Sequence, residues 1–102
     1  MNYANQIGYS DVTPYEIIRA VSGKTLEIRR MSAKRDPAFK PEFVPGGFSA
    51  HCTNQIAQAW IISSDPTASV IRIRKGKLGW KDANGGRYQL AEKPVRFYDF
   101  NF

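Results

Sequence analysis

The chain has 102 residues and a hydrophobic fraction of 42%, which suits one compact domain and excludes a disordered chain. Lys and Arg outnumber Asp and Glu by 15 to 9, and the net charge of +6 favours a nucleic-acid or acidic-protein partner. No apolar run is long enough to span a membrane, the N-terminal residues lack a secretory-signal pattern, and the single Cys52 can form no internal disulfide. We therefore expect a cytoplasmic protein with no membrane contact.

The first predicted element is a β-hairpin. Two runs rich in β-forming residues, Tyr15–Val21 and Thr25–Met31, flank a turn that contains Gly23. Apolar and charged residues alternate in the second run, which is typical of a half-buried strand.

The segment 35–48 is predicted to be an irregular Pro/Gly-rich loop. Pro37, Pro41 and Pro45 recur at every fourth position and precede two glycines, and proline neither donates to a β-ladder nor continues a helix. Aromatic side chains in water are costly, so we expect this loop to lie against the sheet and to offer an apolar contact to a partner. The aromatic residues concerned are Phe39, Phe43 and Phe48.

The second half of the chain predicts a series of short strands, and the stretch Thr53–Trp60 is also compatible with a helical turn or two. The predicted strands are Ala57–Ser63, Ser69–Lys75, Leu78–Asp82, Tyr88–Leu90 and Val95–Tyr98. Short strands with frequent turns favour an all-β fold in which residues 1–102 form a single domain. We expect a small barrel or curved sheet of the SH3-like kind, with about six antiparallel strands.

The densest positive charge lies on one predicted hairpin. Arg72 and Arg74 share one face of a strand, about 7 Å apart, roughly the separation of successive phosphates on a nucleic-acid strand. The predicted phosphate-contacting or acidic-partner face comprises Arg72, Arg74, Lys75, Lys77 and Lys81, with Arg29 extending it. The alternative is that these cations form only the solvated side of an amphipathic hairpin.

Aromatic residues near these cations suggest a second feature. Tyr88 and Tyr98 are candidates for stacking on unpaired bases, because a tyrosine hydroxyl tolerates a wet edge. The alternative is that the rings belong to the core of a small domain.

The neighbouring His51 and Cys52 do not predict a catalytic or metal site. Zinc needs three or four ligands and the chain has one His and one Cys, while adjacent side chains of a strand point to opposite faces. We therefore expect no enzyme, metal or cofactor.

Three stretches carry a resemblance to a known group of proteins. They are FVPGGFSAHCTNQ at 43–55, the hairpin region 60–90, and RFYDFNF at 96–102. Together they resemble a family of small proteins encoded by phages, plasmids and other mobile elements. The family has no assigned activity, so the resemblance implies a genomic setting and no residue roles.

Two functions remain as alternatives from the sequence. One is a nucleic-acid-associated β-barrel that uses the basic hairpin, and the other is a protein-interaction module that binds a host factor through the same face or the Phe39, Phe43 and Phe48 loop. The sequence does not determine the oligomeric state.

Overall fold

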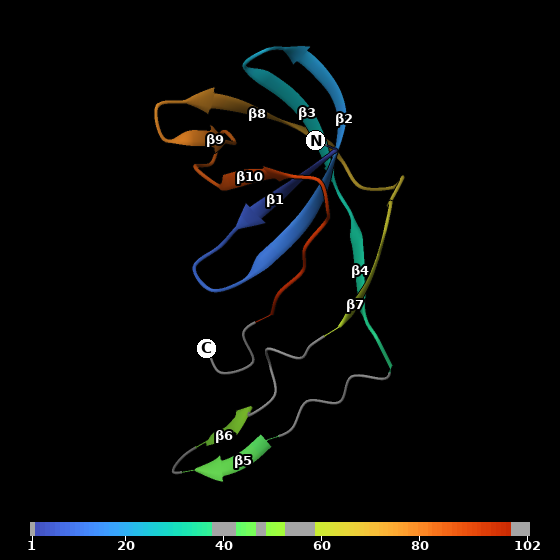
Figure 1. Ribbon diagram of the computed structural model, residues 1–102, viewed down its shortest axis with the longest axis vertical. Helices are drawn as coiled ribbons and strands as arrows, with labels where there is room; N and C mark the ends of the chain where they lie inside the picture. The colour runs from blue at the N-terminus through green and yellow to red at the C-terminus, as the bar shows by residue number, and fades with distance from the viewer. Residues whose placement is uncertain (1, 38–42, 47–48, 53–58, 99–102) are drawn as a thin grey trace.

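The computed structural model describes residues 2–37, 43–46, 49–52 and 59–98, and its regular elements in this part of the chain are all strands (Figure 1). The strands are β1 (Tyr3–Ile7), β2 (Val12–Ser22), β3 (Thr25–Arg30), β4 (Ser32–Arg35), β5 (Phe43–Gly46), β6 (Ser49–Cys52), β7 (Trp60–Ser63), β8 (Val70–Gly76), β9 (Gly79–Lys81) and β10 (Arg87–Ala91).

Six strands form a closed antiparallel barrel in the order β1-β10-β9-β8-β3-β2. The order confirms the prediction of an all-β fold with a small barrel. The predicted hairpin is β2–β3, and the basic hairpin is β8–β9. The barrel closes because β1 pairs with β2 on one side and with β10 on the other.

Alternating side chains of the barrel strands build the core. Leu26 and Ile28 of β3 and Ile73 of β8 point inward, together with Ala4 and Tyr88, and all five are buried. Because the side-chain period of a strand is two, the residues between them point outward, which places Arg72 and Arg74 on the outer surface.

The C-terminal segment covers one part of the outer surface without forming the predicted strand Val95–Tyr98. Its described pairing is a single bridge between Phe97 and Val12. Asn5 is only 4% exposed, and its side chain donates to the Lys93 carbonyl (3.1 Å) and accepts from the Val95 amide (2.9 Å). The prediction of a strand was wrong here because the segment pairs with β2 only at Phe97, which exchanges two backbone hydrogen bonds with Val12. The Asn5 side chain holds Lys93 and Val95 in place of a neighbouring strand.

Between β3 and β8 the chain leaves the barrel. Strands β4 and β7 pair as a two-stranded arm that runs away from the barrel, and β5 and β6 pair as a separate hairpin (Figure 1). The irregular loop predicted over 35–48 therefore contains a strand. Pro45 is accommodated because a two-stranded ladder leaves one edge of each strand unpaired, where a missing N–H breaks no bond.

Some predictions fall on residues that the structure does not describe. Phe39, Phe48 and residues 53–58 of the possible helical turn lie outside the described residues. In the described part of the chain, no helix is long and apolar enough to cross a membrane.

Candidate functional site

Three cations form a row across the outer surface of β8, β9 and β10. Lys81 is the register partner of Arg74 on one side and of Arg87 on the other. Their inward-pointing neighbours, Ile73 and Tyr88, are buried, so all three side chains share the outer face. Neighbouring strands lie about 4.8 Å apart, so this cationic row (Arg74, Lys81 and Arg87) is about 10 Å long.

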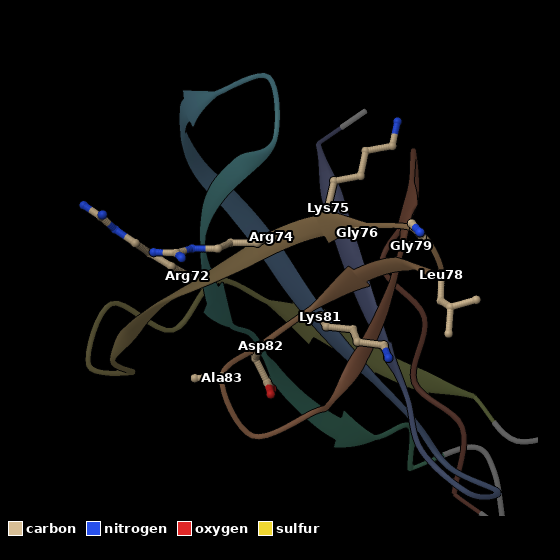
Figure 2. Close-up of a pocket in the computed structure, with 10 residues that line it drawn as sticks. Arg72, Arg74, Lys75, Gly76, Leu78, Gly79, Lys81, Asp82 and Ala83 are labelled. Atoms are coloured by element: carbon tan, nitrogen blue, oxygen red, sulfur yellow. The ribbon is translucent and has the colours of Figure 1, made fainter.

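Two lysines continue the charge to the tip of the β8–β9 hairpin. Lys75 and Lys77 are exposed, and the backbone amide of Lys75 donates to the Lys24 carbonyl (2.9 Å) at the neighbouring β2–β3 turn. The hairpin turns tightly because Gly79 adopts a φ of 103°, which glycine allows without strain. Figure 2 shows Arg72 and Arg74 leaving β8 in one direction and Lys75 in another.

Arg72 and Arg29, the two remaining cations of the predicted face, have carboxylate partners. Arg72 Nε lies 3.2 Å from Glu27 Oε2, and Arg19 Nε lies 2.9 Å from Glu27 Oε1. Hydrogen bonds from Arg19 and Arg72 lower the pKa of Glu27, and the bond from Arg19 contributes more. Glu27 is far from Arg72 in the sequence, and the register of β3 with β8 brings them together.

Arg29 does not extend the free positive charge. Its Nη2 lies 2.7 Å from Glu16 Oε1, and its side chain is only 22% exposed. The Arg29 guanidinium is thus part of the β2–β3 outer surface, where its charge is neutralised.

The residues of the cationic row have no such partners in the described part of the chain. The salt bridges found there join Arg19, Arg29 and Arg72 to Glu16 and Glu27. The outer surface of the barrel therefore has two regions, a charge-balanced one on β2–β3 and an unbalanced positive one on β8–β10.

An open pocket of about 630 Å³ lies along this positive surface (Figure 2). Its lining includes all five cations of the predicted hairpin, namely Arg72, Arg74, Lys75, Lys77 and Lys81. The remaining lining residues are Gly76, Leu78, Gly79, Asp82 and Ala83. The predicted hairpin cations are therefore brought together around one hollow.

Asp82 is the single carboxylate among the lining residues, and it holds the β9–β10 loop in place. Its Oδ1 accepts from the amides of Asn84 (2.9 Å) and Gly86 (2.8 Å), and its Oδ2 accepts from the Tyr88 hydroxyl (2.8 Å). Burial works to raise the pKa of Asp82, but the hydrogen bonds from Tyr88 and the loop amides outweigh it and lower the pKa. The carboxylate fixes the loop that leads into Arg87.

Tyr88 is not available for stacking. It is 6% exposed, its ring packs edge-on against Tyr15 with centroids 5.3 Å apart, and burial and the bond to Asp82 raise its pKa. The predicted stacking role fails because the ring fills the barrel interior, where no ligand reaches it.

Tyr98 lies on the C-terminal segment and not on β8–β10. It is 43% exposed, and the Arg96 guanidinium lies 5.7 Å from its ring centroid and 5.2 Å from that of Trp60. Arg96 also donates to the Val12 carbonyl (3.1 Å), so this cluster ties the C-terminal segment to the arm and the barrel.

The remaining candidates lie in the β5–β6 hairpin. Phe43 pairs with Cys52, and His51 and Cys52 are consecutive residues of β6, as expected for an extended backbone. Within residues 2–37 and 59–98, no three His, Cys, Asp or Glu side chains gather as a metal site would require.

Arg87 is a member of the cationic row that the sequence interpretation missed. The signal was present in the Asn84-Gly85-Gly86 turn, which predicts a hairpin and therefore a partner for Lys81 across it. Without the register, however, the face of Arg87 was not determined.

Comparisons with protein-family models, with curated proteins and with solved structures find no match to this chain. No residue role is therefore carried over from another protein. The candidate site rests on the cationic row, the pocket beside it and the absence of carboxylate partners for the row among the described residues.

Proposed function

We propose that this protein binds nucleic acid through the outer surface of β8, β9 and β10, with Arg74, Lys81 and Arg87 contacting phosphates. One observation carries this proposal, which is the placement of three cations directly opposite one another on adjacent strands. Like charges in direct cross-strand register destabilise a sheet. A stability cost of this kind is expected where a ligand of opposite charge uses the surface.

The contrast with the neighbouring strands supports the proposal over a merely solvated face. On β2 and β3 the cross-strand pairs Glu16–Arg29 and Arg19–Glu27 join opposite charges. A surface selected only for solubility mixes both signs in this way. The β8–β10 surface departs from that pattern over a continuous row.

The chemistry is that of phosphate contact by counterion release. Each Lys or Arg that neutralises a phosphate displaces a condensed counterion, so affinity falls linearly with the logarithm of salt concentration. Lys75 and Lys77 extend the contact toward the hairpin tip. We also propose that the protein is cytoplasmic and is not an enzyme. We further propose that its barrel is of the SH3-like kind and that a mobile element encodes it.

The test is a fluorescence-anisotropy titration with mixed-sequence single strands at about 50 mM salt and above. The triple variant Arg74→Ala, Lys81→Ala, Arg87→Ala should lose at least about tenfold in affinity and reduce the salt slope by about 2, because each phosphate contact contributes about 0.7. The matched control is Arg30→Ala, Lys34→Ala, Lys93→Ala, which removes the same charge at exposed positions outside the cationic row.

Equal losses in both triple variants would show that only net charge matters and would reject the interface. A wild-type protein that does not bind in the micromolar range would reject the function itself. Retention of an acidic protein from nuclease-treated lysate, without nucleic-acid binding, would favour the protein-interaction alternative.

A further inference from the structure

The pocket beside the cationic row is larger and less polar than phosphate contact alone requires. Its volume of about 630 Å³ falls in the range of about 300–1,000 Å³ that holds small organic ligands. Gly76, Leu78, Gly79 and Ala83 contribute lining that offers backbone and aliphatic atoms, and the hairpin cations line the same pocket. This combination of apolar lining with adjacent cations matches a planar ring joined to phosphates.

We propose that the pocket binds an unpaired base of a single-stranded nucleic acid, with the flanking phosphates on Arg74 and Lys81. This inference rests on the proposed function and names its ligand class. Both residues belong to the cationic row and line the pocket, so a strand that follows the row passes the opening.

The lining residues suit a base more than a protein side chain or a lone phosphate. An exposed guanidinium such as that of Arg74 stacks on a base and contacts a phosphate with the same group. Leu78 is 76% exposed, so a base laid against it removes apolar surface from water. A duplex presents no such base without first being unpaired.

The test compares three probes of equal length, on the order of ten nucleotides. They are a single-stranded oligothymidylate, an abasic strand with the same phosphates, and a duplex. The wild-type protein should bind oligothymidylate at least about fivefold more tightly than the abasic strand, since contact with one base is typically worth that much.

Gly76→Leu is the variant that fills the pocket without changing charge. Gly76 lies on the outer face of β8 with Arg72 and Arg74, and an added Cβ would meet only the Gly79 carbonyl oxygen, at 3.9 Å. The variant should bind oligothymidylate no better than the abasic strand, while its affinity for the abasic strand and the duplex stays at the wild-type level. That unchanged affinity also shows that the variant is folded.

Gly23→Leu is the matched control, because Gly23 lies in the β2–β3 turn with no heavy atom within 4 Å of an added Cβ. It should keep the full preference for oligothymidylate.

Equal wild-type affinity for the oligothymidylate and abasic strands would overturn the base site and leave the proposed function intact. Thymidine monophosphate that competes as well as the strand, nucleotide for nucleotide, would overturn it in favour of a free nucleotide ligand. Failure of all three probes to bind would instead reject the proposed function.

Discussion

Glu16 shows how single side chains balance the charge of the β2–β3 surface. Its Oε1 accepts from Arg29 Nη2 (2.7 Å) and its Oε2 accepts from the Ser64 hydroxyl (2.7 Å). The hydrogen bond from Arg29 lowers the pKa of Glu16, burial opposes the change, and Ser64 adds to the lowering. Because Ser64 follows β7, the same carboxylate also ties the base of the arm to the barrel.

We predict that Glu16 makes stability depend on pH in the acidic range. A carboxyl whose pKa is lower in the folded state than its unfolded value of about 4.3 stabilises the protein above that value. This contribution is lost as the pH falls through the folded pKa. Glu16→Gln should therefore cost about 1 kcal/mol at pH 7 and much less near pH 3, measured by urea unfolding.

Glu92→Gln is the control for this prediction, because Glu92 is exposed and its substitution removes the same charge. Its unfolding midpoint should follow that of the wild type at both pH values. A Glu16→Gln deficit that is equally large at both pH values would show that the carboxylate charge is not the cause.

Residue identities alone left the roles of individual side chains open. Arg29 and Arg87 are equally basic in the sequence, yet one is neutralised by Glu16 and the other joins the cationic row. Tyr88 was a candidate for stacking or for the core, and burial in the barrel decided for the core. These outcomes depend on cross-strand neighbours, which a local pattern does not contain.

Among the elements, the β8–β9 hairpin depends on a glycine at its turn. Gly79 has a φ of 103°, a left-handed conformation that L-residues rarely adopt. It precedes Trp80, whose side chain packs against the core, and Lys81 of the cationic row. The turn therefore sets both the packing and the charge register of the hairpin.

We predict that Gly79→Ala destabilises the protein by about 1 kcal/mol, because the added Cβ is strained at positive φ. Thermal unfolding measures this directly. Gly23→Ala should be neutral or slightly stabilising, since Gly23 lies outside the left-handed region and has open space around it. Equal unfolding temperatures for the two variants would contradict the strained-turn explanation.

Strict alternation made β3 and β8 predictable, whereas β1 and β5 lack this pattern and were not predicted. β3 and β8 show apolar and charged residues in turn, which is a local property of their sequences. β1 has the sequence YANQI, and its buried Asn5 gives no apolar signal. β5 was hidden by Pro45, which usually marks a loop.

At the scale of the whole molecule, β1 is the strand that closes the barrel. It pairs along its full length with β2 and with β10, and its second residue, Ala4, is fully buried. Without β1 the edges of both neighbouring strands would be exposed, and an open edge promotes aggregation.

We predict that deletion of residues 1–7 abolishes cooperative unfolding and promotes self-association, measured by near-ultraviolet circular dichroism and size-exclusion chromatography. Ile7→Ser is the control, because Ile7 is 42% exposed and the substitution leaves the β1 backbone in place. A truncated protein that stays monomeric and unfolds cooperatively would show that the remaining strands are sufficient.

The sequence by itself determined the strand-rich fold class, the β2–β3 and β8–β9 hairpins and the concentration of positive charge between Arg72 and Lys81. These properties follow from side-chain periodicity and from short turns, which act over a few residues. Only the tertiary structure decided that β1 closes the barrel, that Glu16 and Glu27 balance Arg29 and Arg72, and that Arg87 completes the cationic row. The physical reason is register, because the pairing of strands distant in the chain determines which charges become neighbours.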